Sequence, residues 1–589
     1  MNRNLRNISS LVFAIGTFPA SAQLCSPAST LAVHLEEVAN YPNYPISDTE
    51  IAVGDSRVLT CTNSWLYLHD KAANQIGTQC RLGDYNSPGT PYFFPETTVS
   101  PTVTFLIGDP VVYYDYEDDR FWVVAIEWGL FQTQLVVSRV QIGVSTDATP
   151  SNWDAINGPN GVSTGDWYKY DFTAWDLNIQ PSPLHGLGHN QNITVDDDTL
   201  YIAFMDDEGT TDRSTTLCMI DKDKLQTGTV SVVTGTTNIV SSELSFLQLK
   251  DNVQSWGTES TYGHVVAVEY DAWNNSHPIY TIATEKKPNY APGPIGIQHY
   301  QDTLILGAIT KSGTPGSYTF SYVSTPITGG NLPDWWDTDA IAASPVPGPM
   351  ILIASKFNHA TYRPDASVGG RLWATHHVRP VAGPSDPSPL DKNIVRWYEI
   401  HTNGWPMTPS ATPTLAQVGE IWPQDDEAFD PSIAVSSNGT VGLVWTQSGA
   451  STYPQFWMGA HLPTDSAGVL SITQMKQQNP YVRPTTQKAD YSGIDPDPTN
   501  ACVFWGHSPL ATLVSPDIFW QSYLAQLCVN GADCDGYADT DSDSYLTSID
   551  PAIFASMHSS HDPRADCNRD GVFDALDYLC YDQAYANQQ

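Results

Sequence analysis

Seven segments of the chain repeat one pattern, and this repetition restricts the possible folds more than any other feature of the sequence. In each segment a polar residue or a glycine precedes two stretches of alternating apolar and polar residues, which an Asp, Asn or Gly turn separates. Alternation with a period of two on both sides of such a turn predicts a β-hairpin. The segments begin at Asp48, Asp109, Asn190, Gly293, His359, Asp430 and Asp490. We therefore expect seven equivalent β units.

The spacing of the segments predicts a β-propeller. Successive segments start 61, 81, 103, 66, 71 and 60 residues apart, which leaves room for four strands and variable loops in each unit. A β-sandwich needs only about 100 residues, and this region is far longer. We expect a mainly β chain in which residues 23–528 form a seven-bladed propeller, with six or eight blades as the nearest alternatives. We assign the additional hairpin around residues 263–282 to the outer part of the third blade.

The two ends of this region contain further strand candidates, at residues 31–38 and 518–527. A ring of blades that is not closed leaves an unpaired strand edge, which promotes aggregation. We expect the two candidates to pair within one blade and to close the ring.

Four segments resemble secreted bacterial propellers whose pattern is related to sialidases and other Asp-box propellers. The resemblance rests on IAVGDSRVLTCTNSWLYLHDK, DPVVYYDYEDDRFW, DPSIAVSSNGTVGLVW and DYSGIDPDPTNACVFW. Ser145, Asp147 and Trp153 also form a degenerate Asp-box that lacks the usual glycine. Asp-boxes are structural turns, so the resemblance implies a fold and no activity. The chain has no F-R-I-P segment, and an arginine triad of the sialidase kind cannot be assigned.

The residue before the innermost strand of each propeller blade lies at the mouth of the central channel. Carboxylates gathered there raise one another's pKa or bind a cation. Alternatively, Asp before a strand hydrogen-bonds neighbouring backbone amides and fixes the loop, which is the role that we favour here. The candidates are Asp48, Asp109, Asn190, Gly293, His359, Asp430 and Asp490.

Other motifs give weaker signals for catalysis. His185 and His189, like His376-His377, lack a convincing third zinc ligand nearby. The G-x-S-x-G around Ser163 lies in a polar loop without the strand and helix of a nucleophile elbow. A glycosidase needs two carboxylates at a defined separation, and Glu127 and Glu269 on predicted strands are candidates. The many tryptophans suit sugar stacking, although blade cores also use tryptophan, which is the role that we favour.

Two acidic loops near the C-terminus, starting at Asp539 and Asp566, have the ligand spacing of calcium sites. Each places oxygen-bearing side chains at positions 1, 3, 5, 9 and 12 of a twelve-residue loop and a backbone carbonyl at position 7. We predict that both loops bind calcium, the first more weakly, because Ser544 stands where the sharp turn favours glycine. The predicted ligands are Asp539, Asp541, Asp543, Tyr545, Thr547 and Asp550 in one loop, and Asp566, Asn568, Asp570, Val572, Asp574 and Asp577 in the other.

These loops and the segments behind them resemble a type I dockerin, in which each loop leads into one helix. The resemblance implies a small α-helical, EF-hand-like domain over residues 529–589. It also implies a cohesin-like protein module as partner, bound through Ser548 and Ile549 in one repeat and through Ala575 and Leu576 in the other.

The N-terminus predicts export. Arg3 and Arg6 precede an apolar stretch at residues 11–18, and Ala20-Ser21-Ala22 forms a cleavage site. We therefore expect a signal peptide over residues 1–22, a secreted, extracellular protein and no membrane insertion. The net charge of −38 excludes nucleic-acid binding.

Nine cysteines in an exported chain predict disulfides. We favour a Cys61–Cys80 bond in the first third of the chain. A second local set surrounds the calcium loops and comprises Cys528, Cys534, Cys567 and Cys580.

These observations together favour a secreted calcium-binding propeller that is docked to an extracellular or cell-surface assembly. In this interpretation the propeller binds a glycan or a protein. The alternative is a glycoside hydrolase or lyase of polysaccharide catabolism, by analogy with the proteins that usually carry dockerins. Two carboxylates about 5–10 Å apart in an open pocket would favour the hydrolase.

Overall fold

The computed structural model describes the chain from residue 23 to residue 559 with gaps, together with Tyr578. The longest gaps cover residues 37–45, 84–91, 95–103, 157–164, 174–185, 250–261, 269–276, 285–298, 343–349, 478–486 and 531–549. Residues 1–22 and, apart from Tyr578, 560–589 also lie outside the description.

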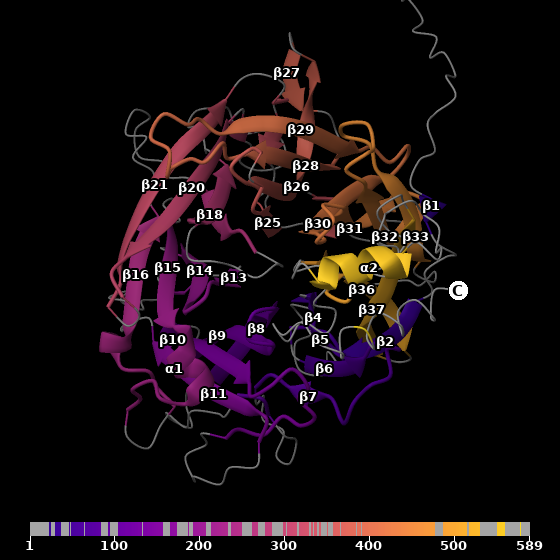
Figure 1. The fold of residues 1–589 in the computed structure, drawn as a ribbon. Helices are drawn as coiled ribbons and strands as arrows, with labels where there is room; N and C mark the ends of the chain where they lie inside the picture. Colours follow the sequence, from indigo (N-terminus) through magenta and orange to yellow (C-terminus); the bar gives the residue numbers. More distant parts are fainter. Residues whose placement is uncertain are drawn as a thin grey trace, which may run out of the picture.

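Seven antiparallel sheets surround a central axis, so the predicted propeller with seven blades is confirmed (Figure 1). Blades 1 to 4 each run from an innermost to an outermost strand. Blade 1 contains β4 (Glu50–Val53), β5 (Arg57–Cys61), β6 (Trp65–Asp70) and β7 (Cys80–Arg81). Blade 2 contains β8 (Thr104–Asp115), β9 (Arg120–Phe131), β10 (Gln134–Ser145) and β11 (Trp167–Thr173). Blade 3 contains β13 (Asn192–Val195), β14 (Thr199–Asp207), β15 (Ser214–Asp221) and β16 (Leu244–Leu249), with the helix α1 (Lys222–Thr227) after β15. Blade 4 contains β17 (Tyr262–Val266), β18 (Ile279–Thr284), β20 (Thr303–Ser312) and β21 (Thr319–Thr328).

The remaining three blades follow the same order. Blade 5 contains β25 (His359–Arg363), β26 (Arg371–Gly383), β28 (Ile394–His401) and β29 (Thr414–Ile421). Blade 6 contains β30 (Glu427–Val435), β31 (Val441–Gly449), β32 (Thr452–His461) and β33 (Ser471–Gln477). Blade 7 contains β35 (Gly493–Asp497), β36 (Asn500–Val514), β37 (Asp517–Asn530) and the N-terminal β2 (Thr30–Glu36).

Short strands extend this scaffold. β1 (Gln23–Leu24) pairs with β37, and β12 (Gly186–Leu187) pairs with β14. β19 (His299–Gln301), β22 (Trp335–Asp337) and β27 (Asp386–Pro389) prolong the sheet of blade 5. A separate small sheet joins β23 (Ile341–Ala342), β24 (Met350–Ile351), β34 (Gln487–Ala489) and β3 (Ile46–Ser47).

The two faces of the propeller differ in which loops they carry. We call the face with the turns between the first and second strands of each blade the turn face, and the face where the innermost strands begin the entry face. Apolar side chains fill the seams between blades. At the seam of blades 5 and 6, for example, Val441, Leu443 and Trp445 pack in one core with Trp373 and Trp397.

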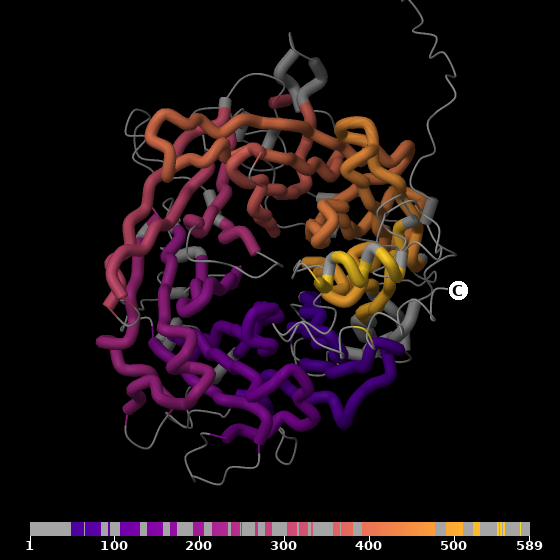
Figure 2. The backbone as a smooth tube through the Cα atoms, in the orientation of Figure 1, coloured from indigo at the N-terminus to yellow at the C-terminus, as the bar shows by residue number. Residues whose placement is uncertain are grey.

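The chain ends close the ring, as the sequence predicts. β2 is antiparallel to β37 over residues 30–36 and 520–525, with Val33 opposite Tyr523. Figure 2 shows the chain passing once round the axis, so that its indigo beginning meets its yellow-orange end. Because β36 pairs along the other edge of β37, this last strand is covered on both sides.

The prediction that the Gly293 segment forms the fourth hairpin is wrong. The inner hairpin of blade 4 is β17 with β18, the segment that the sequence analysis assigned to the outer part of blade 3. In the Gly293 segment the residues on the two sides of the expected turn join different sheets. β19 pairs with β22 beside blade 5, whereas β20 is the third strand of blade 4. Alternation along the sequence cannot reveal which sheet a strand joins.

The predicted Cys61–Cys80 disulfide is also wrong, since both residues keep their thiols. The strand β6 lies between them, because Leu66 pairs with Cys61 on one side and with Cys80 on the other. Two strand spacings of about 4.8 Å separate the cysteines by more than a disulfide spans. Burial raises the pKa of the Cys80 thiol to about 12.

A helix follows the first acidic loop. α2 (Asp550–Ser559) begins at the twelfth loop residue, and its buried Phe554 packs edge-on against Tyr578 of the second repeat, 5.3 Å between ring centroids. The two loops lie outside the described residues apart from Asp550, so the dockerin-like domain stays a prediction. No helix in the described part of the chain has the length and hydropathy of a membrane span.

The closure makes a testable prediction about stability. A truncated protein that starts at residue 41 lacks β1 and β2 and leaves one edge of β37 unpaired, so its melting temperature should fall by at least about 5 °C relative to a protein that starts at residue 23. Calorimetry of the two proteins, with one that starts at residue 26 as control for β1, measures the effect. Equal melting temperatures would show that β2 does not hold the ring.

Candidate functional site

Two aspartates of the predicted channel-mouth set have strained backbones. Asp109 and Asp430 both have a φ of 49°, and each lies where the register of its innermost strand shifts. The backbone N–H of Asp109 donates to Asn63 Oδ1 at 2.8 Å, and that of Asp430 to His377 Nδ1 at 3.4 Å. Each acceptor belongs to the preceding blade, so both aspartates form contacts across a seam. Asp430 is fully buried.

Of the other members of this set, the structure describes His359 alone. His359 is buried, its Nδ1 contacts the carbonyl oxygen of Ile433 at 2.6 Å, and burial lowers its pKa to about 4. His376, next to His377, has a different partner, the hydroxyl of Tyr398 at 2.8 Å. Asp48, Asn190, Gly293 and Asp490 lie outside the described residues.

Glu127 belongs to a buried ion-pair cluster. It accepts hydrogen bonds from Gln141 at 2.9 Å and from Arg139 at 3.4 Å, and Arg139 lies 4.0 Å from Asp171. Burial raises the pKa of Glu127. All four side chains are buried, and Glu269 lies outside the described residues, so this proposed carboxylate pair is not seen.

The calcium ligands cannot be placed, because Asp550 alone among them is described, as the first residue of α2. Within the described residues, no group of three or more His, Cys, Asp or Glu side chains is arranged to hold a metal ion.

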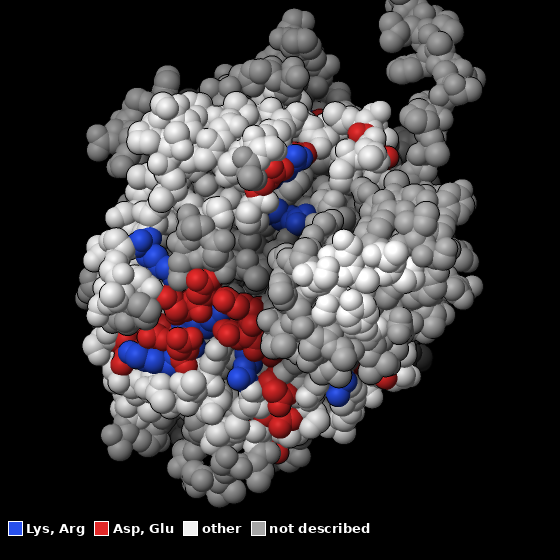
Figure 3. Space-filling model, in the orientation of Figure 1, with Lys and Arg blue, Asp and Glu red and all other residues white. Residues whose placement is uncertain are grey.

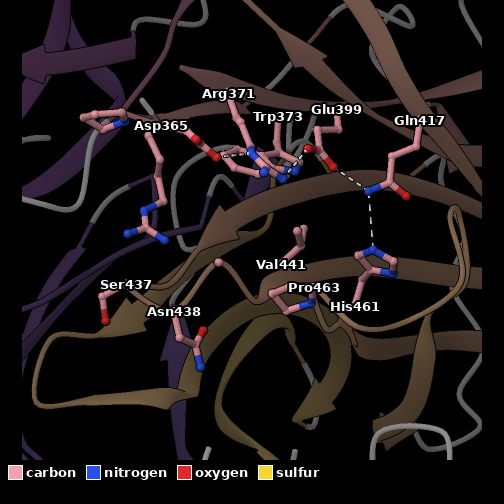
Figure 4. Close-up of a pocket in the computed structure, with 13 residues that line it drawn as sticks. Asp365, Arg371, Trp373, Glu399, Gln417, Ser437, Asn438, Val441, His461 and Pro463 are labelled. Carbon is pink, nitrogen blue, oxygen red and sulfur yellow. Dashed lines mark hydrogen bonds and ion pairs between the residues drawn. The ribbon is translucent and has the colours of Figure 1, made fainter. Parts of the chain in front are cut away.

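A pocket of about 300 Å³ opens at the seam between blades 5 and 6 (Figure 4). The first-to-second-strand turns of both blades contribute to its wall, which places it on the turn face. In Figure 4 the polar side chains of blade 5 lie opposite those of blade 6. The wall residues that matter here are Asp365, Arg371, Trp373, Glu399 and Gln417 of blade 5, and Asn438, His461 and Pro463 of blade 6.

Arg371 joins two carboxylates in this pocket. Its Nε donates to Asp365 Oδ2 at 2.6 Å and its Nη1 to Glu399 Oε1 at 3.0 Å. Because both oxygens bind one planar guanidinium group, they lie within about 8 Å of each other. Burial opposes the ionisation of Asp365, but hydrogen bonds from Ser367 and Arg371 outweigh it and lower the pKa of Asp365 to about 2.

Gln417 extends the network to blade 6. Its Nε2 donates to Glu399 Oε2 and lies 3.4 Å from His461 Nε2. The Nδ1 of His461 contacts the carbonyl oxygen of Val469 at 2.6 Å, which assigns the proton to Nδ1 and leaves Nε2 as an acceptor. Gln417 Oε1 accepts the backbone N–H of Gly468 at 2.9 Å. The amide is therefore oriented by three partners.

At three other seams, a lysine of the next blade occupies the position that the pocket has between blades 5 and 6. Each lysine binds at least one carboxylate of the neighbouring blade. Lys71 of blade 1 donates to Asp497 of blade 7 at 2.8 Å. Lys222 lies 3.0 Å from Asp115 and 2.7 Å from Asp118 of blade 2. Lys311 of blade 4 binds Asp196 of blade 3 at 2.8 Å, and also Asp198. Figure 3 shows acidic side chains gathered over blades 2 and 3 with basic side chains among them.

In blade 6, the position equivalent to these lysines is occupied by a proline. Lys71 lies two residues after His69, which pairs with Val58 of the second strand, and Lys222 lies two residues after Ile220, which pairs with Leu200. His461 pairs in the same way with Val441, and the residue two positions later is Pro463. Since Pro463 has no charged side chain to insert, the seam stays open.

Trp373, in the wall of the pocket, differs from the equivalent aromatic residues of blades 3 and 7. In blades 3 and 7 an aromatic donor on the second strand binds the turn of its own blade: Tyr201 OH binds Asp196 at 2.7 Å and Trp505 Nε1 binds Asp497 at 2.9 Å. Trp373 has the register position of Tyr201, since Thr361 and Thr194 are their partners on the innermost strands. Its Nε1 is buried and has no acceptor among the described residues.

Sequence analysis did not identify this pocket. Two of the three lysines follow aspartate at the end of a third strand, Asp70-Lys71 and Asp221-Lys222, whereas blade 6 has Leu462-Pro463. An alignment of third strands, in addition to the innermost hairpins, would have revealed this difference.

Comparisons with known proteins give little beyond the fold. No protein family model and no curated protein matches the chain. Solved structures that resemble it include Trypanosoma rangeli sialidase in complex with the inhibitor DANA, at 10% identity and a TM-score of 0.26, covering 64% of this chain and 58% of that chain. An α-L-arabinofuranosidase from Fusarium graminearum has 7% identity and a TM-score of 0.34, covering 85% and 97%. An exo-β-1,3-galactanase from Phanerochaete chrysosporium has 9% identity and a TM-score of 0.27, covering 85% and 99%. At these values the likeness carries no argument about activity.

The seam comparison predicts that Pro463→Lys fills the pocket. The new ammonium group should reach Asp365, as Lys71 reaches Asp497, and should stabilise the protein by about 0.5–1 kcal/mol relative to the uncharged control Pro463→Gln. Chemical denaturation of both variants, each also combined with Asp365→Asn, measures the coupling. Equal stability of the Lys and Gln variants in both backgrounds would disprove the equivalence of the seams.

Proposed function

We propose that the protein binds carbohydrate in the pocket between blades 5 and 6. The observation that carries the proposal is the buried Nε1 donor of Trp373 in the wall of this pocket, beside an ordered set of charged and amide groups. A buried donor without an acceptor costs free energy, which a ligand acceptor recovers on binding. Small-molecule pockets typically combine such convergent polar groups with an aromatic wall.

The polar groups of the pocket suit hydroxyl groups. A sugar hydroxyl both donates and accepts, so one hydroxyl can accept from Trp373 while another donates to Glu399. Two guanidinium groups, of Arg363 and Arg371, accompany two carboxylates, of Asp365 and Glu399. This balance favours an uncharged sugar residue over a strongly charged one.

The pocket is already ordered without a ligand. Arg371 and Gln417 both hold Glu399, and His461 with Gly468 fixes Gln417. Because these side chains lose little further freedom on binding, the entropic cost of association is small.

Hydrolysis of glycosidic bonds is a second candidate, favoured by the two carboxylates that share Arg371. The upper limit of about 8 Å on their separation is compatible with the spacing that glycosidases use. Asp365, with its pKa near 2, is ionised at any ordinary pH and cannot act as the general acid, which would have to be Glu399. Both oxygens of Glu399 already accept hydrogen bonds, from Arg371 and Gln417, which is why we place binding first.

We further propose that residues 529–589 bind calcium and attach the exported protein to a cohesin-like module of an extracellular assembly. The two twelve-residue loops support this proposal, as does the helix that begins at Asp550. Many carboxylates in two short loops repel one another without a cation, so calcium should be needed for this part to fold.

Replacing Glu399 with Gln tests the pocket. The variant keeps the side-chain size but removes the charge that orients Arg371, so its Kd for the best oligosaccharide from a glycan array should rise at least about tenfold. Glu243→Gln is a matched control, because Glu243 also pairs with a cation, Lys224 of blade 3, at 2.7 Å, but does not line the pocket.

Calorimetry and product analysis separate the outcomes. Binding that survives Glu399→Gln unchanged would remove the pocket from consideration, as would a wild-type protein that binds no glycan of the array. Release of reducing sugar by the wild-type protein, lost in Glu399→Gln while the oligosaccharide still binds, would establish hydrolysis.

Calcium should stabilise the C-terminal part of the full-length protein. At a calcium concentration one hundred times the Kd, mass action contributes about 2.7 kcal/mol to its unfolding free energy. Calorimetry should therefore show a transition that moves to lower temperature with chelator and that is absent from a protein ending at residue 530. Identical traces with calcium and with chelator would refute the proposal.

A further inference from the structure

The connection between blades 5 and 6 on the entry face carries an exposed tryptophan. The segment at residues 422–427 links the end of β29 to the start of β30. Trp422 is 48% exposed, and no other tryptophan whose side chain is described is exposed to this degree. Since most of the tryptophans whose side chains are described are buried, this position requires a different explanation.

The indole of Trp422 is held in a fixed orientation. Its Nε1 donates to Glu420 Oε2 at 2.7 Å. The other oxygen of Glu420 accepts from Arg396, Nε at 2.8 Å and Nη2 at 2.6 Å. Arg396 is almost fully buried, and its Nη1 donates to the carbonyl oxygen of Pro333 at 3.0 Å. Charge-assisted hydrogen bonds therefore connect the exposed ring to the interior of the blade.

The backbone beneath the ring is anchored as well. Lys392 donates to the carbonyl oxygens of Pro423 and, at 3.0 Å, of Gln424. Two further bonds hold the end of the segment, from Gln447 Nε2 to Asp426 at 2.9 Å and from the backbone N–H of Asn393 to the Glu427 side chain at 3.1 Å. The segment thus forms a rigid ledge, which we call the Trp422 ledge.

The Trp422 ring can contact a ligand through its π faces, because its N–H already donates to Glu420. Gln424 and Asp425 follow it in the chain and are exposed, so polar groups accompany the apolar surface. A sugar ring has the matching character, with an apolar C–H face and a rim of hydroxyl groups.

A protein partner fits the ledge less well. Specific protein interfaces bury about 1,200–2,000 Å² around several apolar or aromatic side chains. The other exposed large apolar side chains of the described chain, such as Phe246, Met407 and Ile472, belong to other segments and do not extend the ledge. One indole is sufficient for one sugar ring.

We propose that Trp422 is a stacking platform for a pyranose ring of an extended polysaccharide, separate from the pocket. The ledge and the pocket lie at opposite ends of β30, whose nine residues span about 30 Å. This proposal rests on the proposed function only for the class of ligand, since different residues make the contact.

Pull-down of the full-length protein on insoluble xylan, cellulose and chitin tests the platform. Trp422→Ala should reduce the bound fraction at least fivefold on the polysaccharide that retains the wild-type protein best, whereas Trp422→Phe should retain part of the binding. Met407→Ala, which removes a side chain that is 63% exposed elsewhere on blade 5, is the matched control and should bind like the wild-type protein.

A circular dichroism melt of each variant excludes unfolding as the cause of lost binding. Wild-type retention by Trp422→Ala would overturn the proposal, as would a wild-type protein that binds none of the three polysaccharides. A failure of the proposed function of the pocket would be recognised separately. Glu399→Gln should weaken binding of soluble oligosaccharides and should leave retention on the polysaccharide intact.

Discussion

In blades 2, 3, 5 and 7 the chain turns back from the innermost strand through a polar hairpin turn, and the packing of the blades presses these turns against the next blade. Carboxylates buried in this way need a cation nearby, because an unpaired buried charge is costly. At three seams a lysine of the next blade supplies the cation. At the seam of blades 5 and 6 the cation is Arg371 of the same blade, and Pro463 stands in the place of the lysine. The arrangement that neutralises Asp365 from within its own blade thus leaves unfilled the position that a lysine fills at those three seams.

The charge distribution explains why we place binding before catalysis. A glycosidase needs one carboxyl group that stays protonated near neutral pH. Glu127 has a raised pKa, but Arg139 and Gln141 enclose it and it does not line the open pocket. In the pocket itself, Asp365 is held ionised by Arg371 and Ser367. Paired, oriented charges of this kind are typical of a recognition surface, where they select a ligand through hydrogen-bond geometry.

The fold could largely be predicted from sequence, because period-two alternation around a turn reports local strand geometry directly. The prediction from alternation failed at the Gly293 segment, where β19 and β20 lie in one alternating stretch of chain yet join different sheets. It failed again at Cys61 and Cys80, since the intervening strand β6 is visible only in the pairing. The pocket depends on which residues of the third strands occupy equivalent positions, and on a proline where other blades have a lysine. The absence of a lysine does not form a motif that can be recognised in the sequence. Of the predicted channel-mouth residues, Asp109, His359 and Asp430 are described, and each forms a hydrogen bond with a neighbouring blade.

In the proposed mode of binding, a ligand in the open seam accepts a hydrogen bond from the Trp373 donor. Indole N–H resonances in ¹⁵N-correlated NMR spectra report this donor directly, with Trp373→Phe to assign its signal. On titration with the best-binding oligosaccharide, the Trp373 resonance should move in proportion to occupancy. The resonance of Trp505, which already donates to Asp497, should stay in place. A saturating ligand that leaves the Trp373 resonance unmoved would contradict the account.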